Sequence, residues 1–141
     1  MATTRVDPEK GKRALSILHR EGIRYLVFTG GEPTLHPDLA SFVRHAADLG
    51  MKVMVVSNAG LLKPKAIHAL AEAGLSSFII SVDAATRETH EQNRGLPGVC
   101  ERIKEANAML KRVKLHATAL SHHEPVGGLR VLARFSPLTG L

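Results

Sequence analysis

The sequence has little cysteine and few aromatic residues. Among 141 residues there is one cysteine, Cys100, and Phe, Trp and Tyr together make up 4%. A single cysteine excludes a disulfide within the chain and is typical of a protein in a reducing compartment. The 19 Lys and Arg are spread along the chain, for a net charge of +6. With so few rings to stack on bases, no nucleic-acid partner is expected.

Long hydrophobic runs are also absent. No run approaches the roughly 20 apolar residues that cross a bilayer, and the N-terminal "MATTRVDPEKGKR" lacks the apolar core of a signal peptide. We therefore expect no membrane partner and predict a cytoplasmic protein. The hydrophobic content of 44% is enough for a core, and the length falls within the range of about 100–200 residues typical of one domain.

Short β-rich runs alternate with segments of helical period. Apolar runs predict strands at 23–28, 52–57, 77–82 and 113–120. Asp7-Pro8, Pro37-Asp38 and Lys63-Pro64 open three helices that stop at Gly22, Gly50 and Gly74, and two further helices are predicted at 86–93 and 99–111.

Strand starts at positions 23, 52, 77 and 113 leave room for a helix in every crossover. The pattern predicts an α/β fold of about four βα units with parallel strands covered on both faces. A closed eight-stranded barrel needs roughly 250 residues. The sheet is therefore either open or part of a barrel.

Polar residues follow the ends of three of these strands, where parallel α/β folds bind ligands. They are Gly30, Gly31 and Glu32, then Ser57 and Asn58, then Ser81 and Asp83. Two glycines let a ligand approach the backbone, and Pro33 biases Glu32 towards an extended conformation. Strand-end carbonyls and the Glu32 carboxylate could then meet a ligand ammonium, although glycine and proline also serve as plain turn residues.

Three stretches together resemble the radical S-adenosylmethionine (radical SAM) enzymes. They are "FTGGEPTLHPDL", "VVSNAGLL" and "ISVDAATRETHEQNRG", in the order of the family's central strands, within a likeness that covers residues 8–120. The resemblance implies a partial (β/α) barrel of the radical SAM, TIM-barrel-like type. It also implies S-adenosyl-L-methionine as cofactor, a [4Fe-4S] cluster in the intact family, and hydrogen abstraction by a 5′-deoxyadenosyl radical.

The resemblance assigns roles to the strand-end residues. The loop Gly30, Gly31, Glu32 and Pro33 would bind the amino group of the methionine moiety. Ser57, Asn58 and Ser81, with Asp83 beside them, would supply polar contacts to the cofactor or substrate, and Arg94 of "NRG" would lie near the methionine carboxylate.

The family's cluster-binding loop, C-x3-C-x2-C, is not in the sequence. Such clusters take several thiolates from one loop, and Cys100 lies elsewhere in the chain. No catalytic or metal-ligating residue is therefore assigned. The helix from Asp7 to Arg20 matches the one that follows the cluster loop, so we expect a radical SAM core that is truncated or split and inactive alone. A C-x3-C-x2-C stretch should then be encoded just upstream of Met1.

The C-terminal 21 residues lose both the βα rhythm and the likeness. We divide the chain into a partial radical SAM core at 1–120 and an irregular tail at 121–141, which a frameshift would explain. Within this tail "SHHEP" brings together His122, His123 and Glu124. Imidazole and carboxylate can bind zinc, but adjacent residues point in different directions, and a metal site is the minor interpretation.

Other residues receive structural interpretations. Cys100 is expected to be a small buried residue. In "RETHEQNR" we expect Arg87, Glu88 and Glu91 to form a solvated helix face. Lys111, Arg112 and Lys114 lie at a helix end, where cations complement the macrodipole.

Two alternatives to a radical SAM core stay open. One is a catalytically silent module that binds S-adenosylmethionine or a nucleoside, and the other is a non-radical α/β-barrel enzyme. Besides the small-molecule cofactor, the expected partners are a separately encoded N-terminal piece or further copies of the chain joined through exposed sheet edges.

Overall fold

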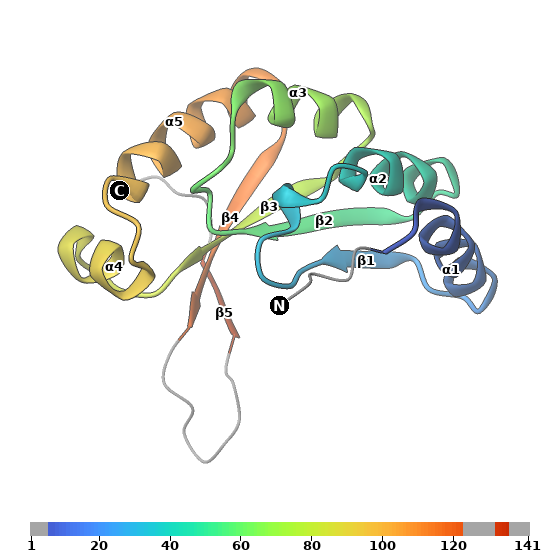
Figure 1. Ribbon diagram of the computed structural model, residues 1–141, viewed down its shortest axis with the longest axis horizontal. Coiled ribbons are helices and arrows are strands. Elements are labelled where there is room, and N and C mark those ends of the chain that lie inside the picture. The colour runs from blue at the N-terminus through green and yellow to red at the C-terminus, as the bar shows by residue number, and fades with distance from the viewer. Residues whose placement is uncertain (1–5, 123–131, 136–141) are drawn as a thin grey trace, which may run out of the picture.

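The computed structural model describes residues 6–122 and 132–135, and these residues form one five-stranded sheet (Figure 1). The strand order is β1-β2-β3-β4-β5; the first three pairs are parallel and the last is antiparallel. The strands are β1 (Tyr25–Phe28), β2 (Lys52–Ser57), β3 (Ser77–Val82), β4 (His116–His122) and β5 (Leu132–Phe135). Strands that are adjacent in the sheet are consecutive in the sequence, which is the strand order of a (β/α) barrel that is not closed.

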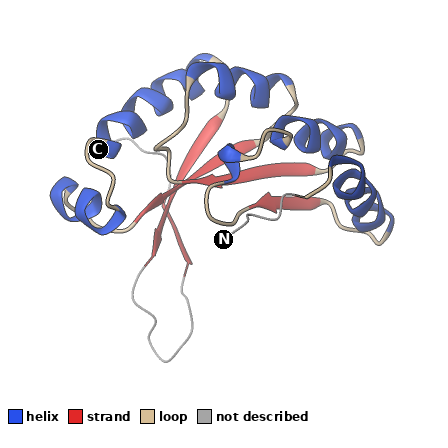
Figure 2. Ribbon diagram, in the orientation of Figure 1, coloured by secondary structure: helices blue, strands red, loops and turns tan. Residues whose placement is uncertain are grey.

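α1 (Pro8–Arg20) precedes the first strand, and the other helices fill the crossovers between the parallel strands. These are a short 3-10 helix η1 (Pro33–Leu35), α2 (Leu39–Asp48), α3 (Pro64–Glu72), α4 (Arg87–Arg94) and α5 (Val99–Arg112). Figure 2 shows α2, α3 and α5 along one side of the sheet, with α4 beyond the end of β3. None of the helices in the described ranges is long and apolar enough to cross a membrane. The predicted α/β fold and partial barrel are confirmed.

The two faces of the sheet differ in burial. In β2, Val53 and Val55 are fully buried towards the helices, and Phe78 and Ile80 of β3 continue this core. On the opposite face of β1, Tyr25 is 72% exposed and Val27 43% exposed. The expectation of strands covered on both faces is therefore wrong, because the described helices cover one face and the other would be enclosed only by a closed barrel.

Several predicted boundaries are confirmed. Asp7 caps α1 by accepting the Lys10 N–H at 3.0 Å, and Pro8 is the first helical residue. β2 and β3 have the predicted bounds. β1 starts two residues later than predicted, and α2 starts at Leu39 after the unpredicted η1.

The C-terminal part differs from the prediction. β4 begins at His116, because α5 continues to Arg112 and Lys114 then adopts a left-handed φ of 58°. β4 runs on to His122, and β5 pairs with it through Leu132. The predicted irregular tail thus contains strand residues, while His123 and Glu124 of the proposed zinc group lie outside the described residues.

Candidate functional site

The loop after β1 is open at its two glycines. Gly30 has a φ of +141°, and a Cβ placed on Gly30 or Gly31 would meet no atom within 4 Å. Glu32 is extended, with φ −140° and ψ 103°, as Pro33 predicts, and Pro33 begins η1. The backbone of this loop is therefore accessible at the end of the sheet where the β1 chain leaves it.

The Glu32 carboxylate joins the end of β1 to the end of β2. Its Oε1 accepts hydrogen bonds from Thr34 N–H at 3.2 Å, Thr34 Oγ1 at 2.5 Å and Ser57 Oγ at 2.9 Å. Its Oε2 accepts the Asn58 N–H at 2.9 Å. Both oxygens therefore hold the loops after β1 and β2 together, and a contact of this carboxylate with a ligand ammonium stays a prediction.

The loop after β2 is also fixed internally. Ser57 is 2% exposed, and its Oγ accepts the Ala59 N–H at 3.0 Å in addition to donating to Glu32. Asn58 Oδ1 accepts the Gly60 N–H at 2.8 Å, and Ala59 has a left-handed φ of 61°. The Ser57 O–H is thus used within the protein, and one acceptor lone pair of the oxygen remains. Its contact with a cofactor stays a prediction.

A second polar group lies beyond β3. The Arg94 guanidinium forms an ion pair with Asp83, in which Nη2 donates to Oδ1 at 2.7 Å. His90, which is 2% exposed, accepts the Asp83 N–H on Nδ1 at 3.2 Å. Burial lowers the pKa of His90, and the nearby Asp83 opposes that shift only in part. Asp83 and Arg94 are therefore brought together as a pair.

His90 is a residue that the sequence analysis missed. It lies four positions before Arg94, so the two share a face of α4. That spacing was the available signal, but histidine in a strongly charged helix is not by itself distinctive.

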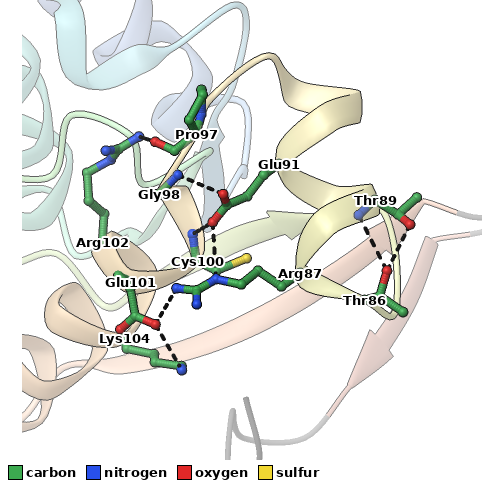
Figure 3. Close-up of polar contacts among 10 residues, drawn as sticks. All are labelled: Thr86, Arg87, Thr89, Glu91, Pro97, Gly98, Cys100, Glu101, Arg102 and Lys104. Atoms are coloured by element: carbon green, nitrogen blue, oxygen red, sulfur yellow. Dashed lines mark hydrogen bonds and ion pairs between the residues drawn. The ribbon is translucent and has the colours of Figure 1, made fainter.

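The charged face of α4 is more structured than predicted (Figure 3). Glu91 accepts the N–H groups of Gly98 at 2.8 Å and Cys100 at 3.3 Å, and Arg87 reaches across to both Glu91 and Glu101. The hydrogen bond from the Gly98 N–H has the largest effect on Glu91 and lowers its pKa. Burial acts in the opposite direction. Glu88 and Arg87 are exposed as expected, although Arg87 is also ion-paired, whereas for Glu91 the interpretation as part of a solvated face is wrong.

The remaining predicted residues have simpler positions. Ser81 is 6% exposed and alternates along β3 with Ile80, so it lies on the face opposite the helices. Cys100 is buried, as predicted, and burial raises the pKa of its thiol. Lys111 and Arg112 occupy the last turn of α5, where they complement the helix dipole.

The predicted residues thus form two groups along one end of the sheet. Glu32, Ser57 and Asn58 are hydrogen-bonded to one another, and Asp83 pairs with Arg94. In the described part of the chain, no three His, Cys, Asp or Glu side chains are grouped so that they could hold a metal ion. The chemistry available here is polar recognition of a ligand by exposed backbone and a fixed arginine.

Comparison with known proteins gives a consistent result. A family model described as the radical SAM superfamily matches residues 2–130. An AdoMet-dependent heme synthase of Methanosarcina barkeri is 36% identical over 87 residues, which are 62% of this chain and 25% of that protein. A probable GTP 3′,8-cyclase of Thermococcus kodakarensis is 32% identical over 123 residues, which are 85% of this chain and 40% of that protein.

A third relative and two solved structures extend the comparison. A PqqA peptide cyclase of Rhodopseudomonas palustris is 37% identical over 90 residues, 64% of this chain and 24% of that protein. Streptococcus suis SuiB bound to its precursor peptide SuiA has a TM-score of 0.69 at 18% identity over 81% of this chain and 26% of that one. BtrN in complex with AdoMet and 2-DOIA has a TM-score of 0.56 at 22% identity, over 83% of this chain and 44% of that one. The chain spans 24% to 40% of the length of the three curated relatives.

Proposed function

Because this chain belongs to the radical SAM superfamily, we propose that its described residues form part of a pocket that holds and orients S-adenosylmethionine for radical chemistry. The observation that carries this proposal is the hydrogen-bonded connection from Glu32 to Ser57 and Asn58. It fixes the Gly30-Gly31 backbone beside the end of β2, where ligands of parallel α/β folds bind.

The first part of the proposed pocket recognises the methionine amino group. Carbonyl groups of the open Gly30-Gly31 segment would accept hydrogen bonds from the ammonium, since no side chain obstructs them. Glu32 supplies negative charge nearby, and its main task is to hold the loop that Pro33 shapes. Ser57 and the Asn58 backbone N–H hold the loop in the same way, through Glu32.

The second part of the proposed pocket recognises the methionine carboxylate. Asp83 holds Arg94 by an ion pair, and a guanidinium has five N–H donors, so it can bind Asp83 and a ligand carboxylate together. His90 fixes the Asp83 backbone. Ser81 lies on the sheet face that carries no described helix, so it would contact the ligand from that side.

The iron–sulfur cluster of the family does not fit this chain. A [4Fe-4S] cluster takes several thiolates, whereas the sequence contains Cys100 alone, and that thiol is buried against α4 with its pKa raised. Bound S-adenosylmethionine supplies the family's hydrogen-abstracting radical after one-electron reduction. The thiolates that would hold such a cluster are not among these 141 residues.

Two kinds of protein partner are proposed for this chain. One proposed partner is a polypeptide segment that carries the cluster ligands, and the other is a further copy of this chain joined at the β1 edge. The single cysteine also favours a second candidate function, a catalytically silent module that binds S-adenosylmethionine. The relatives are named for tetrapyrrole, peptide and nucleotide reactions, so their names do not select a substrate.

Calorimetry of S-adenosylmethionine binding to the full chain tests the proposal. We expect weak binding, because no iron anchors the ligand, and we expect Glu32→Gln to weaken it at least about tenfold. The substitution replaces an acceptor oxygen of a charged group by an NH2 that cannot accept, and such contacts are worth about 1.5–3 kcal/mol. Glu72→Gln, an exposed change at the end of α3, is the matched control.

Two results would contradict the proposal. One is the absence of a saturable heat with wild-type protein at millimolar S-adenosylmethionine. The other is equal affinity for wild type, Glu32→Gln and Glu72→Gln, which would make the loop an ordinary strand exit.

A further inference from the structure

A cavity of about 260 Å³ lies between the end of β3, the start of α4 and the first turns of α5. None of Gly30–Pro33, Ser57, Asn58 or Arg94 lines it. Val82 on its wall alternates with Ser81, so it lies on the helix-covered side of β3. The cavity therefore lies on the other side of β3 from the proposed S-adenosylmethionine pocket, and His90, which holds the Asp83 backbone, borders both.

Two cations form part of the wall, and no carboxylate does. Arg87 uses Nε for Glu91 and Nη2 for Glu101, which leaves Nη1 without a partner in the described ranges. Lys104 donates one hydrogen bond to Glu101 at 3.3 Å and has two further N–H bonds. Figure 3 shows Arg87 extending from α4 towards α5, with Lys104 close to the same Glu101 carboxylate.

His90 adds a buried donor. Its Nδ1 accepts the Asp83 N–H, so the neutral ring carries its proton on Nε2. Nε2 is buried and has no acceptor within the part of the chain that the structure describes. A buried donor without an acceptor costs about 1–3 kcal/mol. The His90 ring lines the cavity, but Nε2 has almost no accessible surface, so a ligand acceptor would reach it only after a small movement of the wall.

The start of α4 is a third feature that favours an anion. Thr86 is the N-cap and Arg87 the first helical residue, and both line the cavity. The Thr86 hydroxyl accepts the Thr89 N–H. The N-terminal end of a helix carries partial positive charge that favours an anion.

We propose that this cavity binds the carboxylate of a small organic acid with a short branched or straight apolar chain. The polar groups on the wall offer hydrogens to an anionic oxygen, while Val82, Ala84 and Ile103 provide an apolar lining for the chain. The volume is below the roughly 300–1,000 Å³ of pockets for drug-sized ligands. A single negative charge fits best because Glu91 and Glu101 already offset much of the charge of Arg87 and Lys104.

Amide NMR of the full chain can test this binding with isobutyrate as the probe. Isobutyramide has the same shape without the charge and is the ligand control. We expect saturable shifts confined to residues 82–90 and 100–104 with isobutyrate, much weaker shifts with isobutyramide, and a change in the His90 ring Nε2–H signal. Lys104→Gln should weaken isobutyrate about two- to fivefold, as for a half-exposed charge contact. Lys65→Gln, an exposed change on α3, should not alter the affinity.

Other outcomes would overturn the proposal. Equal binding of the acid and the amide would exclude recognition of charge, and shifts scattered over the surface or unaffected by Lys104→Gln would exclude this cavity. Tighter binding of inorganic phosphate than of isobutyrate would exclude the carboxylate as the preferred group.

Discussion

Glu91 acts as a helix cap from outside the helix that it caps. Gly98 stands at the N-cap position of α5 and has no side chain to accept the first N–H groups. Glu91, in the last turn of α4, accepts the Gly98 and Cys100 N–H groups instead, and Arg87 holds its carboxylate in place. One residue thereby fixes the angle between two consecutive helices.

This cap should make stability depend on pH. The folded pKa of Glu91 is lowered from its ordinary 4.5, so its contribution is present above that value and is lost as pH falls through the folded pKa. We expect Glu91→Gln to lower the urea midpoint at pH 7. The difference from wild type should shrink as the pH is taken well below 4.5. Glu88→Gln is the control, and an effect of Glu91→Gln that does not change with pH would contradict the cap.

Helices α2 and α3 are each followed by a glycine with a positive φ, but the two glycines have different surroundings. Gly50 follows α2 with φ +83°, and a Cβ there would meet nothing within 4 Å. Gly74 follows α3 with φ +90°, and a Cβ there would lie 2.8 Å from the Cβ of Ala47 in α2. Gly50 therefore serves only the backbone turn, whereas Gly74 also permits the two helices to approach.

A pair of alanine substitutions separates these two roles. Gly50→Ala should destabilise the fold by about 1–2 kcal/mol through the left-handed backbone alone. Gly74→Ala should add a packing penalty of about 1–3 kcal/mol, as overpacked sites do. Urea unfolding of both variants measures the difference. Equal losses would mean that α2 and α3 are not in firm contact at this point.

The elements were predictable where local chemistry decides them. Asp7-Pro8 set the start of α1, and the apolar runs 52–57 and 77–82 gave β2 and β3 their exact bounds. β1 is shorter than its apolar run because the N–H of Ile23, the first residue of that run, closes the turn after α1 by donating to the Leu18 carbonyl at 3.0 Å. The start of β4 moved because Lys114 turns the chain after α5.

The site was predictable in its location but not in its contacts. Parallel strands bring their carboxyl ends to one edge, so Glu32, Ser57 and Asp83 had to lie along it. Which groups the Glu32 oxygens accept depends on the registry of β1 against β2 and on the turn at Ala59. No pattern in one sequence specifies those distances, and the burial of His90 depends on α5 packing over α4.

At the scale of the whole molecule, the described sheet ends at the short strand β1, and its face opposite the helices is exposed at that strand. β1 pairs with β2 alone, and Tyr25 and Val27 expose apolar side chains on the face opposite the helices. Exposed apolar edge strands recruit other chains. In the isolated chain this is the surface on which copies would meet.

Charge at the β1 edge should therefore suppress self-association. We expect Val27→Lys to shift the chain towards monomer in sedimentation velocity, because a lysine opposes pairing at an edge. Leu61→Lys replaces another exposed apolar residue, 47% exposed and located before α3, and should leave association unchanged. Wild-type protein that is monomeric at high concentration would contradict the proposed edge contact.

The sheet order also governs how the chain can fold. Paired residues in the parallel strands are one βα unit apart in the sequence: Tyr25 with Lys52, Met54 with Ser77, and Ser77 with His116. No strand is inserted between two earlier ones, so each new βα unit can dock on the unit before it without waiting for a distant segment. Each closure must still span a whole βα unit, so these strand pairs are expected to form more slowly than hairpins would. On a ribosome, where chains emerge at about 5–20 residues per second, β1 and β2 could pair before the sequence of β4 had been synthesised.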